Sequence, residues 1–170
     1  MRYLKQCLVI CCLLGWPVLV SAQEFILPAN IVLKTSRDYL KYEKDVLSAI
    51  NWLEQTPLNE QSEKRKGINA FVQQWVSGSP NVSVKMYAEI MVFYDANPDL
   101  LTNYMGGWTR YVLENPGDTI DFNANMAGLK SVIAVYKTGK GIKKDPKTEK
   151  LVKLDREGKL EAWAREHFKD

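Results

Sequence analysis

The chain has 170 residues, a formal net charge of +3 and 46% hydrophobic residues, which suits one domain with a core of its own. Basic and acidic residues are nearly balanced, and this excludes proteins that bind nucleic acid through a strongly basic surface.

Residues 1–22 have the pattern of a secretory signal peptide. Arg2 and Lys5 precede an apolar run that is too short to span a bilayer, and small residues before Ala22 form a cleavage site. All three cysteines lie in this segment, so the mature chain would contain no disulfide and no cysteine metal ligand. We expect an exported protein, periplasmic or extracellular after cleavage near Ala22.

The mature chain is predicted to consist of an N-terminal arm, 23–35, and a single helical domain, 36–170. Pro28 interrupts the short apolar runs of the arm and prevents a long regular element there. We expect the arm to pack on the surface of the domain; the alternative is an exposed strand that is offered to a partner.

Apolar residues at helical spacing predict helices over 37–55 and 60–76, the first capped by Ser36 and the second stopped by Gly78. Residues 83–95 are apolar on nearly every side, which is typical of a buried helix. The alternation between Asn81 and Met86 would also fit a strand.

A helix over 97–117 is marked at both ends, by Asn97 as its cap and by Asn-Pro-Gly at 115–117. With 83–95 it should form an antiparallel hairpin at the centre of the domain. Small residues surround Gly106 on one face, although a glycine inside a helix costs about 1 kcal/mol relative to alanine. We therefore expect another helix to approach closely at Gly106.

Further helices are predicted over 121–137 and from Asp145 onward, and Gly158 separates a last amphipathic stretch. No segment has convincing strand and turn chemistry. The predicted fold class is all-α: a single-domain bundle or array of about six helices around a central antiparallel hairpin of the third and fourth.

Four short segments resemble a known family. They read Asn-Trp-Leu-Glu-Gln-Thr-Pro-Leu at 51–58, Gly-Ser-Pro at 78–80, Asn-Pro-Asp-Leu-Leu at 97–101 and Gly-Gly-Trp at 106–108. In this spacing the chain is similar to a family of small exported all-helical proteins of unknown function. The resemblance extends over most of the mature chain. It implies a single helical domain and brings no activity or catalytic residues.

Residues suited to catalysis or metal binding are few. The only histidine, His167, lies in the last turn of the final helix, where a cation stabilises the helix dipole. Asp121, Asn123 and Asn125 imitate the start of a calcium loop, but Met126 stands where the loop requires glycine. We expect no catalytic residue, metal or cofactor.

One candidate ligand site lies on the helix over 97–117, where Asn103, Arg110, Trp108 and Tyr111 combine polar and aromatic groups. Such a mixture can bind a carboxylate or a sugar. The alternative is a solvated strip on a helix that is otherwise buried.

A second candidate site is the lysine-rich stretch 137–153. The lysines suited to contact an anionic surface, such as phospholipid headgroups or an anionic glycan, are Lys140, Lys143, Lys144 and Lys147. Aromatic residues are scarce there, so stacking on nucleic acid is not expected. The alternative is a solvated surface without a partner.

The leading hypothesis is a non-enzymatic module of the cell envelope or secreted space that binds a protein or a ligand. The sequence predicts a regular helical core, but it contains no recognisable set of catalytic residues. One alternative is a carrier that holds a small amphipathic ligand in an aromatic-lined cavity. A less favoured alternative is a carboxylate-dependent hydrolase, with Glu89 as the first residue to test.

Overall fold

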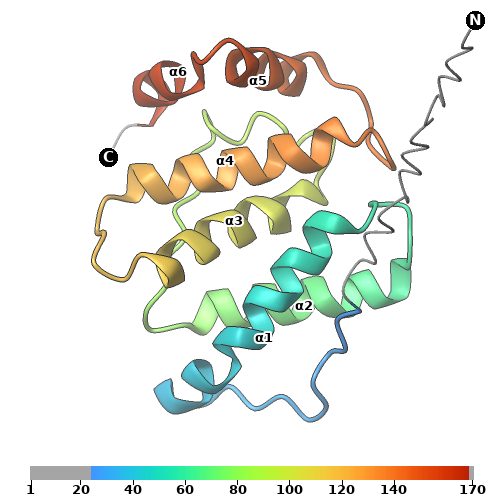
Figure 1. The fold of residues 1–170 in the computed structure, drawn as a ribbon, viewed down its shortest axis with the longest axis vertical. Helices are drawn as coiled ribbons and strands as arrows, with labels where there is room; N and C mark the ends of the chain where they lie inside the picture. Colours follow the sequence, from blue (N-terminus) through green and yellow to red (C-terminus); the bar gives the residue numbers. More distant parts are fainter. Residues whose placement is uncertain (1–23, 169–170) are drawn as a thin grey trace, which may run out of the picture.

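The computed structural model describes residues 24–168, and these contain six α-helices and no β-strand (Figure 1). The helices are α1 (Ser36–Gln55), α2 (Ser62–Gly78), α3 (Leu100–Glu114), α4 (Asp121–Lys137), α5 (Pro146–Arg156) and α6 (Leu160–His167). The all-α class and the number of helices are confirmed. No described helix is long and apolar enough to cross a membrane. The predicted signal peptide lies outside the described residues.

An antiparallel pair, α3 and α4, occupies the centre and makes the most extensive contact of any two helices (Figure 1). Helices α1 and α2 pack on α3, while α5 and α6 pack on α4. A central hairpin is therefore confirmed, but its members differ from those predicted. It joins 100–114 to 121–137, because residues 83–95 form no helix.

Residues 82–87 form no helix, strand, turn or bend, and isolated turns then lead to α3. Ile90 and Phe93 are fully buried, whereas Met86 is 56% exposed. The apolar residues of this segment are thus used in separate contacts and do not form one helical surface. The alternation around Val82 and Val84 does not produce a strand either, because the structure assigns no regular element to residues 82–87.

Two adjacent glycines allow α3 to approach its neighbours on two sides. A methyl group on Gly106 would lie 3.0 Å from Ile50 Cγ2 on α1. One on Gly107 would lie 2.6 Å from the carbonyl oxygen of Ala127 and 2.7 Å from Ser131 Cβ, both on α4. The predicted close approach at Gly106 is confirmed, and the helix that approaches is α1.

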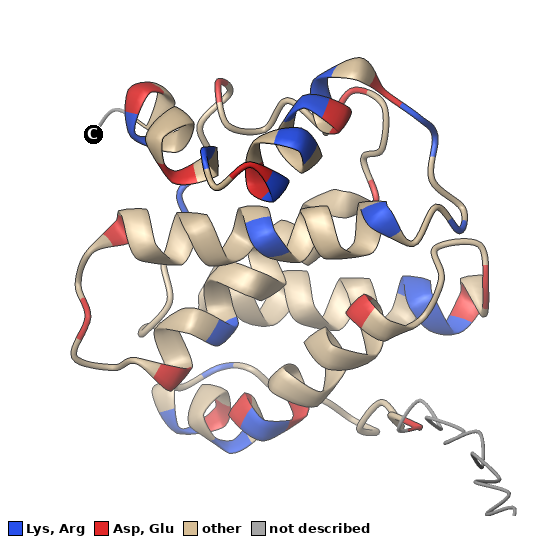
Figure 2. Cartoon of the chain, turned by 45° about the horizontal axis from the view of Figure 1, so that its top comes forward, with Lys and Arg blue, Asp and Glu red and all other residues tan. Residues whose placement is uncertain are grey.

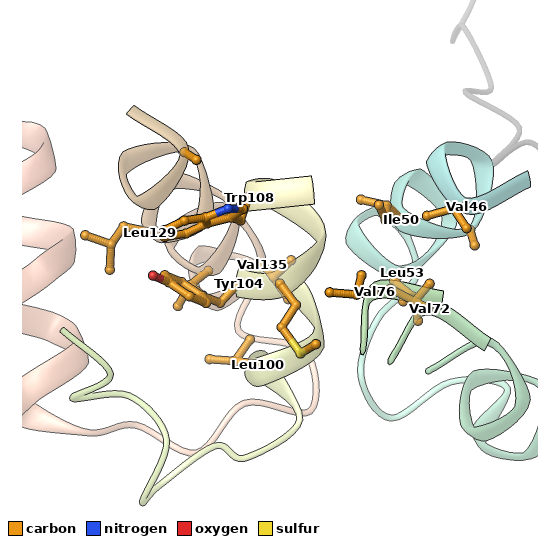
Figure 3. Close-up of a cluster of buried hydrophobic side chains, with 14 of the residues drawn as sticks. Val46, Ile50, Leu53, Val72, Val76, Leu100, Tyr104, Trp108, Leu129 and Val135 are labelled. Atoms are coloured by element: carbon orange, nitrogen blue, oxygen red, sulfur yellow. The ribbon is translucent and has the colours of Figure 1, made fainter. Parts of the chain in front are cut away.

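The core lies on both sides of α3 (Figure 3). Tyr104 and Trp108 are fully buried between α3 and α4, with ring centroids 6.1 Å apart, and Phe93 packs on Tyr104 at 6.0 Å. Val46, Ile50, Leu53, Val72 and Val76 form the α1–α2 part of the core. Aromatic rings therefore fill the space between the central helices.

The N-terminal arm packs against the α1–α2 side of the domain. Phe25 is buried, and Leu27 packs beside Gly67 on α2. Ile26 between them is 79% exposed, so the arm lies on the surface and covers part of the core.

Candidate functional site

The structure separates the four residues of the predicted ligand strip on α3. Trp108 is fully buried, and Asn103 is 2% exposed. Arg110 and Tyr111 are half-buried and already paired with other side chains. The four residues form no continuous surface, because a strip on α3 faces neighbouring helices over most of its length.

Arg110 belongs to a polar contact that joins three helices. Its guanidinium donates hydrogen bonds of 2.7 and 2.6 Å to the two carboxylate oxygens of Glu54 on α1 and one of 2.9 Å to Asn51. Ser131 on α4 donates to the same carboxylate at 2.5 Å. The hydrogen bond to Glu54 raises the pKa of Arg110. A forked pair of this kind fixes geometry as well as charge, so this cluster holds the helices together.

Sequence reasoning missed Glu54 and Ser131. Their partners lie 56 and 77 residues away along the chain, and no local pattern connects them. The only available signal was a glutamate near the end of an amphipathic helix, which is usually a solvated residue.

Tyr111 closes the connection between α3 and α4. Its hydroxyl donates to Asp118 at 2.5 Å, and Asn123 donates to the same carboxylate at 2.7 Å. Both hydrogen bonds lower the pKa of Asp118, and the one between Tyr111 and Asp118 raises the pKa of Tyr111. Asn125 instead accepts a 2.8 Å hydrogen bond from Tyr104. Within residues 24–168, no cluster of three or more acidic, histidine or cysteine side chains could hold a metal ion.

Glu89 and His167 line one surface hollow of about 360 Å³, together with Tyr87 and Glu166. The Nδ1 atom of His167 lies 2.7 Å from the carbonyl oxygen of Trp163, and the two rings stack at 4.5 Å. This contact anchors the imidazole at the end of α6. Both glutamates are exposed, so neither has the apolar surroundings that convert a carboxyl group into a general acid.

The four predicted lysines lie on the α4–α5 connection and the first turn of α5, and all of them are exposed. Figure 2 shows positive charge along this connection, at one end of the bundle. Lys147 lies 3.3 Å from Asp95. Lys140, Lys143 and Lys144 have no ion-pair partner among the described residues.

The backbone of this connection is held by a buried side chain. Asn97, which is 5% exposed, donates a 2.8 Å hydrogen bond to the carbonyl oxygen of Lys143 and accepts another of 2.8 Å from its amide. The predicted capping role of Asn97 is therefore wrong, since α3 begins at Leu100 and the Asn97 side chain faces the lysine loop.

A groove of about 450 Å³ lies along residues 82–87. It is lined by Val76, Ser77, Ser79, Pro80, Asn81, Val82, Ser83, Val84, Met86 and Met105. No charged residue is among them. Tyr104 holds the segment against α3, because its hydroxyl lies 3.2 Å from the carbonyl oxygen of Lys85. Within residues 24–168, the backbone amides of Val82, Ser83 and Val84 make no hydrogen bond to protein.

No family model matches this sequence, and comparison with curated proteins and with solved structures finds no significant match. The resemblance to small exported helical proteins stays a prediction.

Proposed function

We propose that this protein is an exported, non-enzymatic interaction module that binds an extended segment of a partner protein along residues 82–87. The observation that supports this proposal is a segment that belongs to no helix, strand or turn and in which Ser83 is exposed. Its amides at Val82, Ser83 and Val84 have no protein partner among the described residues. Unpaired backbone amides can form hydrogen bonds with an added strand. Because successive amides of an extended chain point to opposite edges, a partner strand that adds at the exposed Ser83 would pair with the amide of that residue.

The neighbouring groove supplies the side-chain contacts that such a partner needs. Its lining combines apolar residues, among them Val82, Val84 and Met105, with three serines. Because the lining is uncharged, the groove suits small apolar or neutral side chains at alternate positions of the bound segment. Met86, at 56% exposure, adds a flexible apolar side chain that adapts to different partners.

Two clusters of polar side chains around α3 are used in internal structure, which supports a binding role over an enzymatic one. Glu54 is saturated by Arg110 and Ser131, and Tyr111 is paired with Asp118. A carrier is less well supported, because the aromatic rings that would line its cavity fill the core instead. The hollows beside residues 82–87 and beside His167 both lie at the surface.

Site-specific photocrosslinking tests the proposal. A benzophenone amino acid replaces Ser83 in the full chain, which is expressed in its own cells, and the matched control carries the same group at Lys44 on α1. Both positions are exposed. We expect a discrete protein adduct from position 83 and none from position 44. Adducts at neither position, or the same adducts at both, would contradict a binding site on residues 82–87.

A proline variant separates backbone pairing from side-chain contact. Ser83→Pro removes the amide donor, whereas Ser83→Ala removes only the hydroxyl group. With a crosslinker placed at Met86, we expect the adduct to be lost in Ser83→Pro and retained in Ser83→Ala. Circular dichroism confirms that both variants are folded. Equal adduct yield in the two variants would show that the backbone of the segment does not bind the partner.

A further inference from the structure

The connection between α4 and α5 has a concentration of positive charge that the packing of the domain does not use. Residues 137–144 contain Lys137, Lys140, Lys143 and Lys144 and no acidic residue. All four side chains are exposed, and none has an ion-pair partner in the described part of the chain. From this patch, called the basic loop below, we propose a second binding surface that docks the protein on a membrane with anionic headgroups.

The backbone of the basic loop is fixed at several points, although its lysine side chains are exposed. Asn97 forms two hydrogen bonds of 2.8 Å with the backbone of Lys143. The amide of Leu58 donates to the carbonyl oxygen of Lys140 at 3.3 Å. At the end of the loop, the amide of Asp145 donates to the Tyr136 hydroxyl at 2.9 Å.

Gly141 allows the loop to lie flat against the α1–α2 connection. Its φ of +74° is a conformation that other residues rarely adopt, and a methyl group there would lie 2.6 Å from the amide nitrogen of Asn59. Ile142, next to it, packs against the core. The lysines are therefore presented from an ordered backbone, and binding does not have to supply the entropy of ordering the loop.

The type of charge favours a membrane surface over one compact anion. The basic loop contains lysine and no arginine, so it lacks the planar fork that recognises a single phosphate or carboxylate through two hydrogen bonds. Lysines act as point charges that are attracted by the field of many headgroups. Lys147 is excluded from the basic loop because Asp95 already neutralises it, at 3.3 Å.

Vesicle co-sedimentation of the full chain tests this proposal, with pure phosphatidylcholine compared with phosphatidylcholine that contains phosphatidylglycerol. We expect binding only to the anionic vesicles, and weaker binding at high salt. The double variant Lys143→Ala/Lys144→Ala should lower the partition coefficient by about 25-fold, since each lysine near an anionic leaflet contributes about fivefold. The matched control, Lys34→Ala/Lys44→Ala, removes the same charge from exposed positions near α1 and should leave binding within about twofold of the wild type.

The variant Asn97→Ala tests the fixed backbone separately, because it releases the loop without changing any charge. We expect binding to the anionic vesicles to fall by about threefold or more, as a freed loop must be ordered again on binding. An unchanged thermal melt in circular dichroism shows that the domain is intact.

Three results would overturn the proposal. The first is an absence of binding to anionic vesicles at low salt. The second is equal weakening of vesicle binding by the two double lysine variants, which would mean that binding depends on the net charge of the protein and not on the basic loop. The third is retention on heparin without binding to vesicles, which would identify a soluble polyanion as the partner.

Discussion

The substitution Gly107→Ala tests the packing at the centre of the bundle. The added methyl group would lie 2.6 Å from a backbone carbonyl oxygen, 2.7 Å from Ser131 Cβ and 3.0 Å from Gly128 Cα. Backbone atoms cannot rotate away, so α3 and α4 must separate. Overpacking of this kind costs about 1–3 kcal/mol, and we take the upper part of that range. Alanine recovers about 1 kcal/mol of helix propensity.

The expected net effect is a loss of about 1–2 kcal/mol in the free energy of unfolding, from the difference of these two contributions. For a chain of this size the melting temperature should fall by about 3–6 °C. Urea unfolding followed by tryptophan fluorescence measures the change. Gly106→Ala should be milder, because its nearest neighbour is a side-chain atom of Ile50 at 3.0 Å and not a backbone atom, and Gly117→Ala is the control, with no atom within 4 Å of its added methyl group. A Gly107→Ala variant as stable as the wild type would refute the close packing of α3 on α4.

Two further predictions concern polar contacts. Glu54→Gln should lower the free energy of unfolding by about 2 kcal/mol in urea titrations, because the half-buried Arg110 loses its charged partner; Glu161→Gln, at an exposed pair, should change it by less than about 0.5 kcal/mol. Hydrogen bonds from Tyr111, Asn123 and the Ile120 amide lower the pKa of Asp118 below its ordinary 3.8. The stability that the ionised Asp118 contributes is therefore complete above pH 3.8 and is lost as the pH falls through the lowered pKa. Asp118→Asn should therefore reduce the loss of stability between pH 5 and pH 2, and an unchanged acid dependence would contradict this assignment.

Local patterns predicted much of the fold. The helix over 121–137 has the predicted bounds, and Asp145 caps α5 through a 2.8 Å hydrogen bond from the Thr148 amide. The strip around Gly106 indicated a close helix contact, which α1 makes. These features depend on residues a few positions apart, and such residues are close in space in any helix.

The segment 83–95 could not be assigned correctly from its composition. A buried helix has apolar residues on every side. An irregular segment whose apolar residues enter separate contacts, as Ile90 and Phe93 do, can have the same composition. Asn97 shows the same limit, since its position before a proline suits a helix cap, but its amide is used 46 residues away by Lys143. For the candidate sites, composition located the lysines, and only the fold shows that Lys147 is paired with Asp95.

Hydrogen exchange at residues 82–87, measured by mass spectrometry, tests the proposed partner site most directly. In the isolated protein, the amide of Ser83 should exchange as fast as that of a free peptide, because the residue is exposed and no described group accepts its hydrogen bond. In the complex of the wild-type chain with the partner that the position 83 crosslink identifies, the same amide should be protected. Slow exchange in the isolated protein, or unchanged exchange in the complex, would contradict the proposal that this segment pairs with an extended partner.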